Sequence, residues 1–567
     1  MIDYAVPDAV IDQIVWTAIN DSSCAQDFRD YLRHAPEGSL HRDDAIDRLI
    51  AIDEAETSCS DAVCSYSIAI KEIETLANAG NSTAQFHMGK VLALGIGINE
   101  DRDRSTGFYQ LAILQGEPRS HVNLALRLDE HGTPESIAEA RRLLTVVSEL
   151  GEGTATFHLG RMISRGRGEE ADRPDPVKSF ELFHQAWDQG FFAAGHWIGY
   201  QLINGNGVRQ DTELGHEWVK RAADRGCIGA INALASNAEF GTGGMDKDVR
   251  AALSWYQKGA ELGNEESQQR LANILLRGEG VPKDGALAVN WLKRAAVCGD
   301  SVAQRILGLT YIWGIDVIRN STFGKKWLTR SAEQGDAHGA YHLGKILQRE
   351  DPPRFDEAYR WFDKAARTGH SEAQGCLGIC FWYGQGVAPD PEAAFKWINL
   401  CALQGDTWGL YLLGRLHYTG ISVPINYVKA AQCFRDAAVK GHPGGQAKLG
   451  WCYLHGEGVD KDVAQGMVWI SRAAEQGDEG ACTTIGYVLR DGIGVDRNPA
   501  EASKWFLDAA KNGDMRGQYE LAMLYAEGIG LEQNLEEAKR WMEVAANQGD
   551  EDATSWLANQ ESRLQSC

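Results

Sequence analysis

The sequence predicts an all-α protein made of stacked helix pairs, and three observations carry the prediction. At 567 residues the chain exceeds the roughly 250–300 residues that one compact core sustains, so it holds several domains or a repeat array. It contains 62 Gly and only 14 Pro, which favours the array. Above all, a glycine after an Ala-rich segment recurs at intervals of 34 to 39 residues, and a period in the thirties is typical of stacked helical hairpins. These anchor glycines are Gly80, Gly116, Gly151, Gly190, Gly226, Gly263, Gly299, Gly335, Gly369, Gly405, Gly441, Gly477, Gly513 and Gly549.

The first helix of each repeat is expected to begin directly after the anchor glycine. Asn or Asp follows the anchor in most repeats, and such a side chain accepts hydrogen bonds from the free N–H groups of a starting helix. Nine positions after the anchor the residue is always Gly or Ala. Because glycine costs about 1 kcal/mol in a helix, its recurrence there predicts the close approach of a neighbouring helix. The capping residues are Asn81, Asn264, Asp300, Asp336, Asp406, Asp478, Asp514 and Asp550.

A Gly-x-Gly pair closes the first helix, and an Asp or Asn then begins a second one. A phosphate-binding loop would follow a strand and carry Gly-Lys-Ser or Gly-Lys-Thr, so pairs such as Gly205/Gly207 are predicted to be helix C-caps. From the anchor Gly226 onward, a Trp stands eight residues before each anchor, with Cys433 in its place once. This spacing predicts a core stripe between hairpins. The series is Trp218, Trp255, Trp291, Trp327, Trp361, Trp397, Trp469, Trp505 and Trp541.

These blocks closely resemble the Sel1-like repeat, a relative of the tetratricopeptide repeat. SVAQRILGLTYIWG (301–314) and AQGMVWISRAAEQGDEGA (464–481) carry the resemblance, which extends over roughly residues 81–567. It implies a right-handed superhelical solenoid of antiparallel helix pairs, whose usual role is protein binding without catalysis. On this basis the domains are expected to be an acidic helical cap module at 1–80, thirteen repeats at 81–549 and a C-terminal capping helix at 550–567.

The N-terminal segment differs from the repeats in charge and in pattern. Residues 1–80 contain 16 acidic and 5 basic residues, and three short stretches of helical apolar spacing begin near Val10, Phe28 and Ala45. The run from Trp16 to Leu49 resembles a short helical module of bacterial proteins that sometimes stands beside caspase-like peptidase domains. The resemblance suggests a bacterial protein with a partner in a protease or signalling system.

Composition and motifs argue against several classes of function. A formal net charge of −23 disfavours nucleic acid and anionic membranes as partners. The chain shows no run of 18 apolar residues and no signal-peptide pattern, which predicts a cytoplasmic protein. The 12 cysteines lack paired metal-ligand spacing, so reduced thiols are expected, with neither metal nor cofactor. Catalytic motifs such as HExxH, Gly-x-Ser-x-Gly and the Walker sequence are absent, and we expect no enzyme.

One series of cations recurs at the same number of residues after the anchor glycine, on predicted first helices. We call this number the frame position. A His and a Lys or Arg stand three residues apart on one helical face, in a pattern suited to the carboxylates of a partner peptide. The alternative is that these side chains pair with Asp and Glu of neighbouring helices. The series is His87/Lys90, His158/Arg161 and His342/Lys345, with Arg415 as a partial copy.

A second series consists of large aromatics away from the repeat's own Trp position. They are candidate anchors for a partner protein, and the alternative is that they fill irregular gaps in the core. These residues are Trp197, Tyr200, Trp313, Trp382, Tyr383, Trp408 and Trp451.

The function favoured by these patterns is that of a non-catalytic scaffold, adaptor or regulatory subunit that binds protein. One alternative is a partner, inhibitor or target of a caspase-like protease in bacterial signalling or antiviral defence. The alternative from another class is an enzyme without a recognisable motif.

Overall fold

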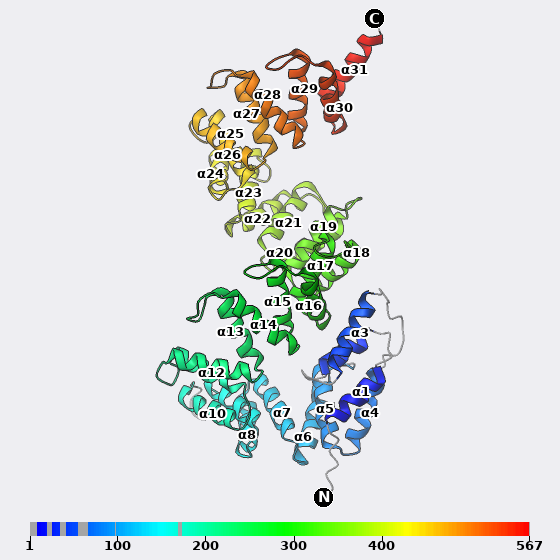
Figure 1. The fold of residues 1–567 in the computed structure, drawn as a ribbon, viewed down its shortest axis with the longest axis vertical. Coiled ribbons are helices and arrows are strands. Elements are labelled where there is room, and N and C mark those ends of the chain that lie inside the picture. Colours follow the sequence, from blue (N-terminus) through cyan, green and yellow to red (C-terminus); the bar gives the residue numbers. More distant parts are fainter. Residues whose placement is uncertain are drawn as a thin grey trace. The chain divides into compact units, whose positions relative to one another are not determined.

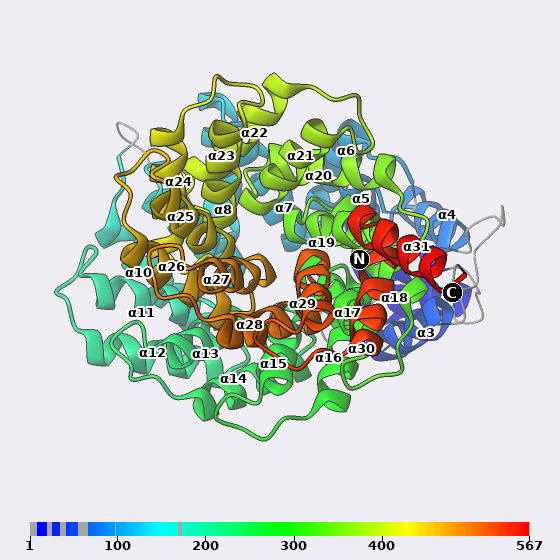
Figure 2. The same cartoon turned by 90° about the horizontal axis from the view of Figure 1, so that it is seen from above.

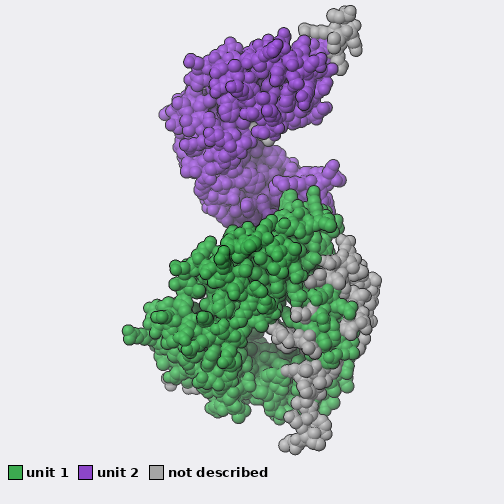
Figure 3. Space-filling model, in the orientation of Figure 1, with its two compact units in different colours: residues 1–331 green, residues 332–567 purple. Residues whose placement is uncertain are grey.

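The computed structural model describes residues 8–19, 25–34, 41–54, 66–96, 98–167 and 173–565. The chain divides into two compact units, residues 1–331 and 332–567, which Figure 3 shows in green and purple. Every regular element in the described part is a helix. From α5 onward, consecutive helices pack as antiparallel pairs, so the predicted all-α solenoid is confirmed (Figure 1).

Unit 1 begins with four helices that precede the repeats and continues with helix pairs. The N-terminal helices are α1 (Asp8–Ile19), α2 (Ala25–His34), α3 (Arg42–Glu54) and α4 (Tyr66–Asn78). The pairs are α5 (Ser82–Leu94) with α6 (Arg102–Leu114), α7 (Pro118–His131) with α8 (Pro134–Glu149), α9 (Gly153–Ser164) with α10 (Pro176–Asp188), α11 (Ala194–Asn204) with α12 (Thr212–Asp224), α13 (Ile228–Phe240) with α14 (Val249–Glu261), α15 (Glu265–Arg277) with α16 (Gly285–Cys298), and α17 (Ser301–Trp313) with α18 (Ser321–Glu333).

Unit 2 continues the same arrangement after α18 and ends on a single helix. Its pairs are α19 (Ala337–Gln348) with α20 (Phe355–Arg367), α21 (Ser371–Tyr383) with α22 (Pro391–Leu403), α23 (Thr407–Thr419) with α24 (Tyr427–Val439), α25 (Pro443–His455) with α26 (Val463–Glu475), α27 (Glu479–Asp491) with α28 (Pro499–Lys511), and α29 (Met515–Glu527) with α30 (Leu535–Asn547). The last helix is α31 (Glu551–Gln565). No described helix has the length and apolarity that crossing a bilayer requires.

The predicted caps form as the sequence indicates. The Asn81 side chain accepts a hydrogen bond from the N–H of Ala84 at 2.8 Å, and Asp300 accepts one from Ala303 at 2.5 Å. Gly205 and Gly207 have φ of +68° and +74°, a left-handed backbone that favours glycine. In two repeats a histidine is the N-cap, because the Nδ1 atoms of His370 and His442 accept the N–H bonds of Ala373 and Gly445. Most helices of the array therefore begin at a residue whose side chain caps them, whereas α9, α11, α13 and α20 begin without such a hydrogen bond.

The small residue at the ninth frame position is a point of close helix contact, as predicted. A Cβ added to Gly414 would lie 2.6 Å from the Phe434 ring, and one on Gly486 would lie 2.6 Å from the Phe506 ring. Both rings are completely buried. Glycine thus makes room on the first helix for the largest core side chain of the second.

Most of the Trp series packs against the apolar clusters, as the predicted core stripe requires, but of its nine members Trp327 alone lies fully inside the core. Trp327 is buried, whereas the other eight tryptophans are half-buried. The next residue along the chain is the core residue, as in Phe362, Phe434 and Phe506. A cation three residues after the Trp covers several of the indoles, with Lys364 at 5.4 Å from the Trp361 ring and Arg472 at 4.8 Å from the Trp469 ring. The tryptophans therefore lie at the rim of the core, where a charged group reaches both the indole and solvent.

The N-terminal helices contact two distant parts of unit 1. Helix α4 packs on α5, and α1 packs on α4, which continues the solenoid at its beginning. Helices α2 and α3 also pack against α16, which follows them by more than 200 residues. The three predicted helices of this segment are confirmed as α1, α2 and α3. Their contact with α16 was not predicted.

Candidate protein-binding surfaces

The first helices of neighbouring pairs form a continuous face in each unit. In unit 2, Arg415 of α23 donates a hydrogen bond to Tyr383 of α21, and Tyr487 of α27 donates one to Glu520 of α29. Seen from above, α27 and α29 lie inside α28 and α30 (Figure 2). We call this surface the first-helix face. It holds most of the residues that the sequence singles out.

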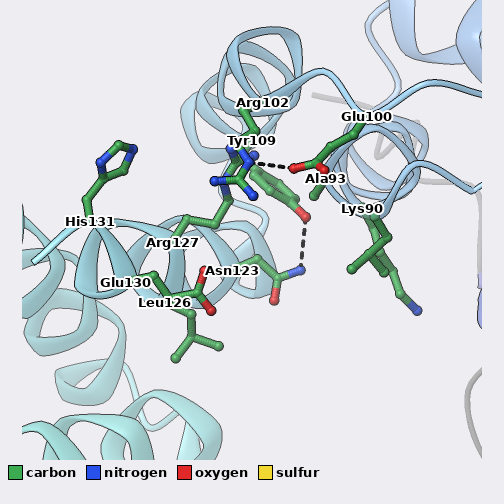
Figure 4. Close-up of a pocket in the computed structure, with 11 residues that line it drawn as sticks. Lys90, Ala93, Glu100, Arg102, Tyr109, Asn123, Leu126, Arg127, Glu130 and His131 are labelled. Atoms are coloured by element: carbon green, nitrogen blue, oxygen red, sulfur yellow. Dashed lines mark hydrogen bonds and ion pairs between the residues drawn. The ribbon is translucent and has the colours of Figure 1, made fainter. Parts of the chain in front are cut away.

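In unit 1, the first predicted pair separates into a buried and a half-exposed residue. His87 is 7% exposed and its ring meets Phe86 edge-on at 5.2 Å, so it lies in the interior. Lys90 is half-buried and lines a groove of about 470 Å³ between α5, α6 and α7. Figure 4 shows Lys90 at one edge of this groove and His131 at the other. Only the cation of this pair is therefore placed to meet a partner.

The groove around Lys90 is polar, and its side chains bind one another. Arg127 donates to Ser105 Oγ at 2.6 Å, and that hydroxyl donates to the carbonyl oxygen of Gly89 at 2.7 Å. Asn123 donates to the Tyr109 hydroxyl at 3.4 Å, and burial raises the pKa of Tyr109. In the described part of the chain, no group of three or more His, Cys, Asp or Glu side chains is placed to hold a metal ion. The groove therefore combines charged side chains of both signs with an apolar part formed by Ala93, Leu94 and Leu126.

The second predicted pair carries less charge than the sequence suggests. Burial, together with nearby Arg161 and Arg165, lowers the pKa of His158 to about 4, so this histidine is neutral at physiological pH. Its Arg161 neighbour lies over the Trp197 ring at 5.5 Å, and burial lowers the pKa of Arg161. A neutral imidazole offers a carboxylate no ion pair, so the charge at this position comes from Arg161, and the binding of a partner by His158 and Arg161 stays a prediction. Trp197 serves the core, in edge-on contact with Phe157 at 6.2 Å.

We expect the His158 environment to make unit 1 sensitive to acid. The folded-state pKa of about 4 lies below the ordinary value of 6.5, so the unfolded chain takes up a proton first as the pH falls. Stability is therefore full above about pH 6.5 and is lost as the pH falls toward 4. Between pH 7 and about pH 5 the loss should be roughly 2 kcal/mol, and less in His158→Gln. Urea unfolding at both pH values measures the difference, and parallel losses in the two proteins would contradict it.

In unit 2, the third predicted pair lies on α19 beside a stacked histidine. His342 and Lys345 are both half-buried, and the Tyr341 ring stacks on His370 at 5.0 Å with an interplanar angle of 25°. Lys345 faces the buried thiols of Cys376 and Cys380, whose pKa values are raised by burial to about 12. These cysteines are therefore protonated neighbours of the ammonium group and do not neutralise it.

The next repeats combine aromatic rings with the cation Arg415. Trp382 and Tyr383 stack with an interplanar angle of 1°, and Tyr383 is 52% exposed. The Arg415 guanidinium lies 5.1 Å from the Trp382 ring and 5.9 Å from the Tyr411 ring, and it donates to the Tyr383 hydroxyl at 3.2 Å. The structure thus brings three of the sequence-predicted residues into one group and adds Tyr411 to it.

Helix α25 extends this group by one repeat. Trp451 is half-buried and stacks on the exposed His455 ring at 4.0 Å. Lys448 stands one turn before Trp451 on the same helix. Lys345, Arg415 and Lys448 lie at or near one frame position on their first helices, and none forms an ion pair within the described residues. We call these three residues, with Trp382, Tyr383, Tyr411 and Trp451, the aromatic-cationic strip.

Charge on the neighbouring repeats is arranged differently. The first helices α19, α21, α23 and α25 contain Lys345, Arg415 and Lys448 but a single acid, Glu372. In the next two repeats, the arginines of the first helices have acidic partners. Arg490 of α27 donates to Glu520 at 2.5 Å, and Arg516 of α29 donates to Asp552 of α31 at 3.0 Å. The alternative of local pairing therefore holds for these arginines and not for the strip.

Known proteins share this architecture and its repeat. The Sel1 repeat profile matches twelve segments that together cover most of the chain, and it does not match the α7–α8 pair. The segments are residues 82–117, 154–191, 196–227, 228–264, 265–300, 301–336, 337–370, 371–406, 409–442, 443–478, 481–514 and 516–550.

The chain belongs to the Sel1 repeat family.

Relatives of this Sel1 repeat protein come from several bacteria. A protective antigen of uropathogenic Escherichia coli strains, which displays an SLR fold, is 26% identical with a TM-score of 0.57 over 87% of this chain and 97% of its own. A Sel1 repeat protein from Oxalobacter formigenes is 26% identical with a TM-score of 0.34, over 64% and 93%. An uncharacterized protein of Neisseria meningitidis serogroup B (strain ATCC BAA-335 / MC58) is 24% identical over 228 residues. This match covers 36% of the chain and 47% of the relative, so the chain spans about half the length of that curated protein.

Sel1 repeats typically form scaffolds for protein interaction. The matched segments begin at residue 82, after the acidic N-terminal segment. The resemblance of that segment to the module beside caspase-like peptidases stays a prediction. Two of the remaining aromatic candidates belong to unit 1: Tyr200 on α11 is 51% exposed, and Trp313 at the end of α17 is 58% exposed. Trp408 on α23 of unit 2 is half-buried, beside Gly375 of α21.

Sequence reasoning missed two features of the strip. Lys448 stands one turn from the predicted cation position, so strict alignment of frame positions passes over it. Tyr411 was visible, because Phe86, Phe157 and Tyr341 occupy the same frame position one residue before the His position. The signal available for both was the composition of the first helices, which are rich in aromatics and poor in acid from α19 to α25.

Proposed function

We propose that this protein is a cytoplasmic, non-catalytic adaptor that binds an extended acidic segment of a partner protein along the aromatic-cationic strip of unit 2. The chain has a net charge of −23, yet three cations, Lys345, Arg415 and Lys448, form no ion pair with any residue that the structure describes, and this observation carries the proposal. A carboxylate of the partner would supply what each cation lacks within the described residues.

The aromatic residues add a second kind of contact to the strip. The parallel Trp382–Tyr383 stack is rigid, because Arg415 binds the Tyr383 hydroxyl and covers the Trp382 ring. Rigid aromatic groups lose little conformational entropy on binding, and Trp, Tyr and Arg are enriched among the residues that dominate binding energy. The strip therefore suits a segment in which acidic residues alternate with apolar ones.

The test uses random peptides of about twelve residues displayed on phage, which extend to roughly 40 Å. Peptides selected on the wild-type protein should be rich in Asp and Glu with interspersed apolar residues. The triple variant Lys345→Glu, Arg415→Glu, Lys448→Glu should weaken their binding at least about tenfold, mainly by slower association. The salt dependence of binding should also diminish in the variant.

A matched control separates this site from net charge. Lys396, Lys429 and Lys504 are exposed lysines on the second helices α22, α24 and α28 of the same unit. Their reversal to Glu changes the net charge by the same amount and should leave peptide affinity within about twofold. Equal weakening by both triple variants, or selected peptides without acidic enrichment, would overturn the proposal.

A further inference from the structure

The N-terminal helices join two places in unit 1 that the repeat array itself keeps apart. Helix α4 leads directly into the first repeat, whereas α2 and α3 lie against α16, the second helix of the sixth pair (Figure 1). One apolar cluster contains core residues of α1–α6 and of α13–α18, including Phe28, Ile46 and Leu292. The intervening repeats form clusters of their own. The contact thus connects the beginning of the array to its sixth pair.

Two ion pairs bind α3 to the sixth helix pair, and α3 supplies the cation of one and the anion of the other. Arg42 at the start of α3 lies 3.3 Å from Glu265 at the start of α15, and its side chain is 11% exposed. The same guanidinium donates to the carbonyl oxygen of Leu32 in α2 at 3.1 Å, so one residue ties together three helices. Asp47 of α3 accepts from Arg294 of α16 at 3.1 Å, and the Arg294 side chain is 18% exposed.

The charges of the two segments are complementary over a wider area. Residues 1–80 contain 16 acidic and 5 basic residues, whereas residues 285–331 contain 7 basic and 2 acidic residues. Opposite net charge of this size favours association and weakens as salt is added. Regions of a protein can open locally without global unfolding, and the ion pairs are the salt-sensitive part of this contact beside its apolar cluster.

We propose that the N-terminal helices α1–α3 act as an acidic clasp, which closes the six pairs α5–α16 into a ring by docking on α15 and α16 and opens when its ion pairs are broken. The equilibrium between the closed and the open form would then depend on charged partners and on salt. An acidic partner, a basic partner of the module or high salt would each favour the open form. This device lies in unit 1 and is independent of the strip proposed to bind peptides in unit 2.

The test is amide hydrogen exchange on the full-length protein. The double variant Glu265→Lys, Arg294→Glu breaks both ion pairs at constant net charge, and exchange in α2, α3 and α16 should accelerate roughly tenfold. Salt of about 1 M, where charges are screened beyond about 3 Å, should accelerate the same helices in the wild type. The swap Asp47→Arg with Arg294→Asp should restore protection relative to either single change. Arg221→Glu, which breaks an ion pair with Glu217 inside α12, serves as the control and should leave α2, α3 and α16 unchanged.

Two results would overturn the clasp. Wild-type protection of α2 and α3 in the double variant and at high salt would make the contact a permanent part of the core. Equal acceleration throughout α5–α18 would show that the contact supports the fold of the whole unit. The proposal is supported if amide exchange becomes faster in α2, α3 and α16 while the hairpins α7–α12 keep their protection.

Discussion

Replacing Phe506 by Ala should cost about 3–5 kcal/mol of local stability, more than any other single truncation discussed here. The side chain is completely buried in an apolar cluster that α28 shares with α29, and residues of α27 pack against this cluster. Its ring fills the space that Gly486 leaves on the facing helix and meets Tyr487 edge-on at 5.5 Å. Because the ring is enclosed by three helices, the cavity would remain largely unfilled. Hydrogen exchange of α27, α28 and α29 measures the loss.

Trp505→Ala is the informative control for this variant, because it removes a larger side chain from the preceding position. Trp505 is half-buried, so its truncation should cost about 1–2 kcal/mol. In either variant the helices α19–α22 should keep their protection, since repeats couple mainly to their nearest neighbours. If Trp505→Ala lowers the local stability more than Phe506→Ala does, the tryptophan, and not the phenylalanine, is the main core residue.

The contrast between these two positions shows what the repeat pattern predicts and what it leaves open. The 36-residue period gave the helix pairs, and the polar residues after each anchor gave their caps, because both depend on local sequence. The Trp position is the more regular one, yet regularity does not distinguish a core residue from a rim residue. The cation that stands three residues after most of the tryptophans, such as Lys364 after Trp361, does not make this distinction either, because Arg330 covers the buried Trp327 in the same way.

The candidate site divides in a similar way. The sequence placed Lys345, Arg415 and the aromatics of α21 on one kind of helix, and the structure brings Arg415, Trp382 and Tyr383 into direct contact. It did not show that His87 is buried or that His158 is neutral, because both depend on how neighbouring helices cover the imidazoles. The α3–α16 contact was equally hidden, since no local pattern encodes a pairing across more than 200 residues.

Gly199→Ala should lower the free energy of unfolding of its hairpin by about 2–3 kcal/mol. Gly199 of α11 faces Gly215 of α12, and an added Cβ would lie 2.6 Å from the Gly215 carbonyl oxygen and 3.2 Å from the Val219 nitrogen. Backbone atoms cannot rotate away as a flexible side chain does, so the two helices would have to separate. This cost should exceed the roughly 1 kcal/mol that alanine gains over glycine in a helix.

Gly107→Ala provides the matched control, because it makes the same change in a helix of the same unit. Gly107 lies within α6, and no neighbouring atom outside its own helix lies within 4 Å of an added Cβ. This variant should therefore gain about 0.5–1 kcal/mol from helix propensity and the less flexible unfolded chain. Urea unfolding followed by tryptophan fluorescence compares the two variants. If both variants are more stable than the wild type, the glycines at the ninth frame position are not needed for close packing. If Gly199→Ala is less stable and Gly107→Ala is more stable, glycine is needed where the paired helices cross.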